Sequence, residues 1–241
     1  MYPSEQERVV IAEAEKVMQE TMAKYDPSHD VFHVQRVRKT ALSIANALPA
    51  RNPDLLVVEL AALLHDVLDK KYVSAEQAAD PYAFFLPFFQ SVKAKHGLDL
   101  ISDGRAALVA KVVDHVSWTT ETRLKKEGKW IEWHETCVEL HCVQDADRLD
   151  AIGAFGVLRC AAYSAAVNRP LHVPITSPDA LISNSAIGHF HEKLVLIRDR
   201  LKTEPGRLLG EKRHSVLVAF MDSVEEEYHN TLIGAEPVVV A

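Results

Sequence analysis

The sequence predicts an all-α fold. Apolar residues recur at intervals of three and four along most of the 241-residue chain, which is the spacing that gives a helix one apolar face. Helix start and stop signals, such as capping Ser and Asp residues and prolines, separate these stretches. Alternation of polar and apolar residues is nowhere strong enough to indicate a sheet, so we expect helices alone.

Three helices are predicted in the first part of the chain. Ser4 and Glu7 form a capping-box pattern at the start of the first helix, which has an apolar face and ends at a proline-containing break. A second helix is expected over about residues 28–48. After another proline-containing break, a third is expected over residues 55–68.

The middle of the chain has weaker patterns. Residues 72–104 are mixed, and an aromatic stretch interrupted by Pro87 indicates short helices or a lid. Residues 105–116 are predicted to be helical. Residues 119–133 are charged and contain glycine, so we interpret them as a loop.

Helices are predicted again in the last part of the chain. Residues 135–156 and 157–167 should form one long helix or two short ones. Residues 168–188 are rich in proline, glycine and serine and should form a loop, and so long a loop in a compact domain usually has a function. Two closing helices are expected over residues 187–201 and 212–229.

The 241 residues could form one large domain or two small ones, and their composition indicates a globular protein. The chain is 48% hydrophobic and 25% charged, which is typical of a folded protein. Its 27 basic and 34 acidic residues give a net charge of −7, so a nucleic acid is an improbable partner. A small anionic substrate remains compatible, because a bound metal can reverse the local field. A homodimer is left open as the oligomeric state.

Several features favour a cytoplasmic protein. Cys137, Cys142 and Cys160 have no CxxC spacing and are expected to be reduced thiols. The polar N-terminal residues do not resemble a signal peptide. No run of 18 apolar residues exists that would indicate a membrane span.

His65 and Asp66 end the apolar run of the third predicted helix and are the first candidates for metal ligands. Adjacent helical residues point about 100° apart, so both can reach one ion at the helix end. An imidazole with a carboxylate suits a divalent metal. Asp69 lies one turn further on. Alternatively, His65 caps the helix and Asp66 is solvated, which is the commoner arrangement for an isolated His-Asp pair.

A second candidate group lies on the second predicted helix. His29, His33 and Arg36 fall at i, i+4 and i+7, so they share one face of an otherwise apolar helix. This pattern suggests a cleft, although a solvated stripe would look similar.

A third group contains three carboxylates within six residues. Asp147 and Asp150 share a helix face, whereas Asp145 points about 200° from Asp147. Burial of these carboxylates in a largely apolar segment requires a cation, which a metal, Arg148 or a lysine would provide. Without such a partner, the segment would be a charged surface turn.

Together the three groups form a pattern. A His, a distant His-Asp pair and a final Asp on separate helices can supply four ligands and leave positions open for water and substrate. In this order, and with Ala146-Asp147-Arg148-Leu149 around the last Asp, the chain resembles the HD-domain metal-dependent phosphohydrolase superfamily.

The resemblance narrows to small stand-alone HD hydrolases, some of which are nucleotide pyrophosphohydrolases. The blocks that carry it are residues 28–37, 65–71 and 144–153, with His189-Phe190-His191-Glu192-Lys193-Leu194 similar to a closing His-Phe-Tyr-Glu-Lys-Leu block. The resemblance spans about residues 23–226. It implies a single HD-type domain over residues 1–241, with an HD core over about 23–165 and closing helices over about 185–230.

The resemblance implies a ligand set and two catalytic residues. The ligands would be His33, His65, Asp66 and Asp147, with Asp145 as the weaker alternative to Asp147. Asp69 and Lys71 follow the pattern His-Asp-x-x-Asp-x-Lys. Asp69 would hold or deprotonate the attacking water, and Lys71 would bind a phosphoryl oxygen. The divalent cofactor would be Mn, Mg, Co, Fe or Ni.

Further residues are candidates for substrate binding. Cationic side chains would offset charge on the phosphoryl oxygens, and histidines near the site would bind substrate. These candidates are Arg36, Arg148, Lys193, His115 and His29.

The expected function is hydrolysis of a phosphate ester or anhydride by metal-activated water, with a nucleotide as the expected substrate. One alternative is a mixed-valence di-iron oxygenase, which would need further ligands from His96, His115, His134 or His141. A second is an HD fold without catalytic activity that senses a nucleotide.

Overall fold

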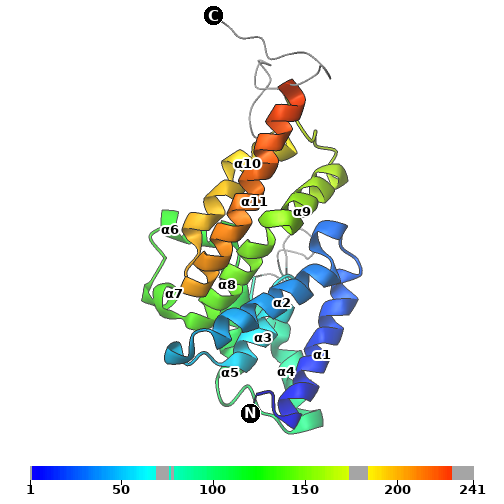
Figure 1. Cartoon of the computed structure of the whole chain (residues 1–241). Coiled ribbons are helices and arrows are strands. Elements are labelled where there is room, and N and C mark those ends of the chain that lie inside the picture. The colour runs from blue at the N-terminus through cyan, green and yellow to red at the C-terminus, as the bar shows by residue number, and fades with distance from the viewer. Residues whose placement is uncertain (1, 69–75, 77–78, 174–183, 230–241) are drawn as a thin grey trace, which may run out of the picture.

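A computed structural model describes residues 2–68, 76, 79–173 and 184–229 (Figure 1). Every regular element in these ranges is a helix and none is a strand, so the all-α prediction is confirmed. Among the helices described, none is both long and apolar enough to cross a lipid bilayer.

The third α-helix lies at the centre of the core. Nine of its ten residues are buried, from Leu56 to Leu64, and it packs against four neighbouring helices, α1, α2, α5 and α8. The predicted capping box of Ser4 and Glu7 is present at the start of the first helix. The elements of this part are α1 (Glu5–Met22), η1 (Pro27–His29), α2 (Val31–Asn46), η2 (Pro49–Arg51) and α3 (Leu55–Leu64).

The middle of the chain is more helical than predicted. Its elements are α4 (Pro81–His96), α5 (Arg105–His115), α6 (Trp118–Lys126), α7 (Glu132–Thr136), α8 (Val138–Asp150) and α9 (Gly153–Ala166). The aromatic stretch belongs to one helix, α4, despite Pro87. Phe85, Phe89 and Val92 are buried at i, i+4 and i+7, and this apolar face offsets the backbone hydrogen bond that Pro87 cannot make.

The prediction of a loop over residues 119–133 is wrong. Most of it forms α6, whose N-terminus is capped by Ser117, and the start of α7. Only Glu121 and Leu124 of α6 are buried, so the helix lacks the apolar stripe by which helices are recognised.

The C-terminal helices also depart from prediction. The helix expected over 187–201 is two elements, α10 (Ala186–Glu192) and the 3₁₀ helix η4 (Leu194–Arg200), separated at Lys193. The last helix, α11 (Glu204–His229), begins earlier than residue 212 and packs along α9 (Figure 1). Of the loop predicted over 168–188, residues 174–183 lie outside the described residues, and α10 already begins at Ala186.

The start of α11 packs closely against α8. A Cβ atom added at Gly206 would lie 2.3 Å from Asp145 Oδ2 and 2.7 Å from Thr203 Oγ1. We therefore expect Gly206→Ala to lower the free energy of unfolding by about 1–3 kcal/mol, because the overpacked side chains must move. Urea denaturation would measure this loss. The exposed Lys212→Ala in the same helix should change stability by less than about 0.5 kcal/mol. Equal stability of the two variants would contradict the close packing.

Candidate metal centre

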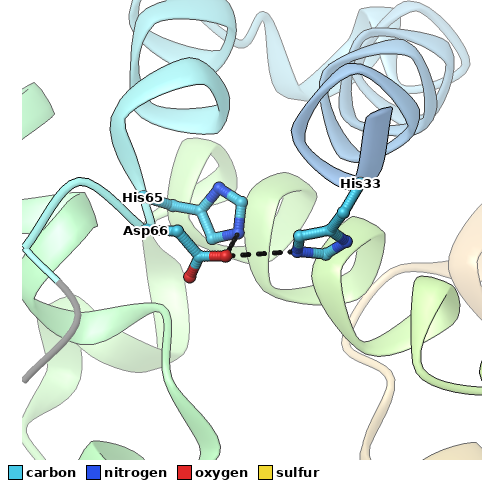
Figure 2. Close-up of side chains that lie close together, drawn as sticks. All are labelled: His33, His65 and Asp66. Carbon is cyan, nitrogen blue, oxygen red and sulfur yellow. Dashed lines mark ion pairs between the residues drawn. The ribbon is translucent and has the colours of Figure 1, made fainter. Parts of the chain in front are cut away.

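Two helices bring three of the four predicted metal ligands together. His33 lies in the first turn of α2, where its backbone N–H donates to the capping Asp30 carboxylate. His65 and Asp66 follow the last residue of α3. Figure 2 shows the two imidazoles and the carboxylate converging, and their candidate ligand atoms all lie within 4.8 Å of one another.

The fourth predicted ligand, Asp147 of α8, lies at the edge of this cluster. Its Oδ1 is 3.7 Å from His33 Nε2 and 3.9 Å from His65 Nε2. Asp66 Oδ2 is 3.3 Å from each of the same two nitrogens. Two imidazole nitrogens and two carboxylate oxygens therefore face one small region from three helices.

Hydrogen bonds on the outer sides of the imidazoles fix their orientation. His65 Nδ1 donates to the Ala62 carbonyl oxygen at 2.8 Å, and His33 Nδ1 donates to Asp150 Oδ2 at 2.7 Å. With Nδ1 protonated, a neutral ring presents the lone pair of Nε2 to the cluster.

The inward-facing atoms fit a divalent metal. His33 Nε2, His65 Nε2 and Asp66 Oδ2 are buried and have no hydrogen-bond partner among the residues that the structure describes. A buried polar atom is costly unless it is paired, and one ion among these atoms would satisfy all three. Two nitrogen and two oxygen donors suit first-row divalent metals such as Mn, Fe, Co and Ni.

The charge of the cluster also favours a cation. Burial alone would lower the pKa of His65, but the carboxylates of Asp66 and Asp147 outweigh it and raise that pKa to about 9. Burial raises the pKa of Asp66, yet its contacts with His65 and His33 hold it well below its usual range. The cluster therefore stabilises positive charge strongly, whether a proton or a metal ion carries it.

Asp150 lies behind His33 in a network of its own. Its carboxylate accepts the His33 Nδ1 hydrogen bond and two hydrogen bonds from Arg36, at 2.8 and 2.9 Å. Arg159 Nη1 is 3.4 Å away. Burial raises the pKa of Asp150, but the bonds from His33 and Arg36 outweigh it, so the carboxylate remains ionised. This is the carboxylate–histidine arrangement that orients metal ligands in many proteins.

A cavity of about 420 Å³ opens over the cluster. His65, Asp66 and Asp147 line its acidic end, and the cationic side chains of Arg123 and Lys193 line it as well. Its other lining residues are His29, Leu68, Pro81, Val113, Asp114, Ser117, Trp118, Thr119 and Thr120. The size falls within the usual range for a small-molecule site.

Two predicted substrate-binding residues lie at this cavity. Lys193 ends α10 and is part of the lining. His29 lines it too, with Nδ1 2.7 Å from the hydroxyl of Ser28 and its ring 5.9 Å from that of His33.

The structure does not bring Arg36, Arg148 or His115 to the cavity. Arg36 is paired with Asp150 and packs on the Phe155 ring. Arg148 is buried, with its guanidinium paired with Glu121 and donating to the Arg200 carbonyl oxygen. His115 donates to the Lys111 carbonyl oxygen and packs against other aromatic rings, those of Trp133 and His134.

Asp145 is turned away from the cluster, as its helical direction predicted. The helix α8 begins at Val138, so Asp145 and Asp147 are both within it and point to different sides. Both Asp145 oxygens are engaged by the backbone N–H groups of Lys202 and Thr203 and by the Thr203 hydroxyl.

Asp69 and Lys71, the predicted catalytic pair, lie outside the described residues. Leu68, which immediately precedes Asp69, lines the cavity. None of the histidines proposed as extra ligands for a di-iron centre joins the cluster. His96 is near Glu13, His115 is described above, and His141 bonds to the His134 carbonyl.

Sequence reasoning missed Asp114 as a cavity residue and Asp150 as a partner of His33, and it did not select Arg123 for substrate binding. Arg123 belongs to the segment interpreted as a loop. For Asp150 a signal existed, because it shares a helix face with Asp147.

Comparisons with known proteins identify a relative of this chain and several structures with the same fold. No family model matches the chain. Protein YpgQ of Bacillus subtilis is 30% identical over 215 residues, covering 87% of this chain and 89% of YpgQ. A crystal structure of YpgQ in complex with ADP has a TM-score of 0.62 at 26% identity, covering 90% of this chain and 98% of that one.

Two further crystal structures have the same fold. The Lin1889 protein of Listeria innocua has a TM-score of 0.67 at 26% identity, with 94% and 99% of the two chains covered. An HD-superfamily hydrolase of Bacillus thuringiensis has a TM-score of 0.65 at 23% identity, with 93% and 99% covered. The chain therefore belongs to the protein family that includes YpgQ, and it has the fold of an HD-superfamily hydrolase.

Proposed function

We propose that this protein hydrolyses a phosphate ester or anhydride of a nucleotide with the help of a divalent metal ion. One observation carries the proposal. The donor atoms of His33, His65 and Asp66 are buried, have no hydrogen-bond partner in the described part of the chain, and converge beside a cavity lined also by cationic side chains, those of Arg123 and Lys193. A metal ion and the neighbouring cationic side chains could each bind oxygens of the same polyanion. This arrangement therefore suits a polyanionic substrate.

The ligands of the ion would be His33, His65, Asp66 and Asp147. When bound, a divalent ion lowers the pKa of a coordinated water and polarises a phosphoryl oxygen. Asp150 would keep His33 oriented through its Nδ1–H bond.

Other side chains of the cavity would bind and orient the substrate. Lys193 and Arg123 would neutralise oxygens of the phosphate chain. His29 would hold a proton near the leaving group. By their resemblance to the family pattern, Asp69 would hold the attacking water and Lys71 would bind a phosphoryl oxygen.

A nucleotide is the proposed substrate for two reasons. YpgQ was crystallised with ADP, and the present chain belongs to the same family. The cavity also has apolar walls, from Leu68, Val113 and Trp118, against which a base could pack.

Metal-stripped protein should have no nucleotide hydrolase activity and should regain it with at least one of Mg, Mn, Co, Fe and Ni. The reason is that the donor cluster requires a cation for catalysis. The measurement is chromatography of the products from a panel of nucleotides, with phosphate resolved from pyrophosphate. The double variant His65→Ala, Asp66→Ala serves as the blank.

The products distinguish the finer reactions. Pyrophosphate with a monophosphate would establish a pyrophosphohydrolase, and phosphate from monophosphates would establish a nucleotidase. Hydrolysis no faster than that of the double variant with every metal and nucleotide would refute the proposed substrate class.

A further inference from the structure

The helix α6 forms one wall of the cavity beside the metal centre. Its capping residue Ser117 and its first turn, including Trp118, line the cavity, and so does Arg123 one turn later. The position of these side chains relative to Asp147 therefore depends on how α6 is held against the rest of the molecule.

The face of α6 that carries Glu121 is attached to the rest of the molecule by ion pairs more than by apolar packing. Glu121 lies two residues from Arg123 and so points about 160° away from it around the helix. Glu121 is only 1% exposed, and Leu124 is the only other side chain of α6 that is buried. A helix with one buried apolar side chain and a half-buried Trp118 gains less from the hydrophobic effect than a helix with a buried apolar stripe.

Three cationic side chains converge on Glu121. Arg148 of α8 pairs with Oε2, and Oε1 accepts hydrogen bonds from Lys125 at 2.7 Å and from Lys202 at 3.3 Å. Burial raises the pKa of Glu121, but these cations, with Arg148 first, outweigh it and lower the pKa to about 2. The carboxylate is thus ionised in the interior and fully compensated.

The partners of Glu121 connect α6 to the metal centre. Arg148 directly follows the predicted ligand Asp147 on α8, and its guanidinium also donates to the Arg200 carbonyl oxygen at 2.9 Å. The Arg200 guanidinium in turn packs over the Trp118 ring, 3.9 Å from its centroid. The segment containing Arg200 and Lys202 therefore contacts both the start and the middle of α6.

We propose that Glu121 is a positioning residue for the substrate cavity: its buried ion pair with Arg148 fixes the α6 wall, and with it Arg123 and Trp118, relative to the metal ligand Asp147. This inference rests on the proposed function only in taking the cavity as the substrate site. It assigns to Arg148 a positioning role in place of the predicted contact with substrate.

The test is hydrogen exchange of the full-length protein, followed by mass spectrometry, in Glu121→Gln. Loss of the charge leaves Arg148 without its counterion, so residues 117–126 should exchange at least about tenfold faster than in the wild type. In the same variant, KM for a nucleotide should rise about tenfold with kcat changed less than about threefold, because binding geometry and not the metal is disturbed. Metal affinity, measured by calorimetry, should stay the same.

Glu59→Gln is the matched control. Glu59 is also buried and ion-paired, with Arg38, but it contacts neither α6 nor the cavity. It should destabilise the protein without changing exchange in residues 117–126. Equal exchange in these residues for the two variants would overturn the proposal. If Glu121→Gln does not fold, the milder Lys202→Met should increase exchange in 117–126, and no increase would overturn the proposal equally.

Failure of this inference can be told apart from failure of the proposed function. If no nucleotide is hydrolysed, the exchange rates still decide whether Glu121 holds α6. If nucleotides are hydrolysed but exchange and KM do not respond to Glu121→Gln, the positioning role alone is refuted.

Discussion

Asp66→Asn should weaken divalent-metal binding by at least about 100-fold and abolish metal-dependent hydrolysis. Asp66 Oδ2 lies 3.3 Å from both imidazole Nε2 atoms, so the change replaces a charged central donor with a neutral amide. Even partners outside the direct ligand set typically contribute 10–100-fold to metal affinity, and we expect a direct ligand to contribute more.

Thermal unfolding measures this loss without reliance on any substrate. A metal present at about 100 times its Kd should stabilise the wild type by about 2.7 kcal/mol, which corresponds to a rise in Tm on the order of 5–10 °C for a chain of this size. The Tm of Asp66→Asn should not respond to the same metal. Asp222→Asn changes an exposed carboxylate of α11 in the same way and should keep the full response. A normal shift in Asp66→Asn would remove Asp66 from the ligand set.

Part of the candidate metal centre could be predicted from helical geometry, whereas the choice of its four residues as ligands came from the resemblance to the HD superfamily. The His65–Asp66 pair ends an apolar run that is buried almost completely. His33 lies on the face of α2 that also carries Arg36. The angle between Asp145 and Asp147 separated the buried structural carboxylate from the one that faces the cluster. Such predictions depend only on positions within one helix, which the sequence specifies directly.

The cavity wall could not be predicted in this way. Residues 119–133 are charged, and the helix within them is attached through Glu121, not through an apolar stripe. Two of the three cations that compensate Glu121 are distant in sequence: Arg148 lies 27 positions further along the chain and Lys202 lies 81 positions further. Pairing between distant side chains leaves no periodic signal, so a charged helix and a charged loop look alike.

Arg36 and Arg148 illustrate the same limit. Both are plausible phosphate ligands from sequence, because Arg36 shares a helix face with His33 and Arg148 directly follows Asp147. In the structure each has a buried carboxylate as its partner, Asp150 for Arg36 and Glu121 for Arg148. A residue type and its spacing show that a cation is near the site, but only the fold decides whether it faces the substrate or another side chain.

Asp150→Asn should weaken metal binding about 10–100-fold although Asp150 does not face the metal site. Its carboxylate accepts the His33 Nδ1 hydrogen bond at 2.7 Å, which holds the imidazole with Nε2 turned to the cluster. The Asp150 carboxylate makes His33 a stronger metal ligand through its negative charge, which an amide lacks. The amide can also turn its NH₂ group toward the imidazole ring. Calorimetric titration of metal into stripped protein measures the change in affinity.

Arg36→Met separates this orienting role from simple neutralisation of buried charge. It removes two hydrogen bonds to Asp150 and leaves the contact with His33 in place. If Asp150 acts on the metal through His33, Arg36→Met should lower metal affinity by less than about threefold, even where its loss of stability matches that of Asp150→Asn. Equal losses of metal affinity in the two variants would mean that the charge balance around Asp150, and not the orientation of His33, controls the site.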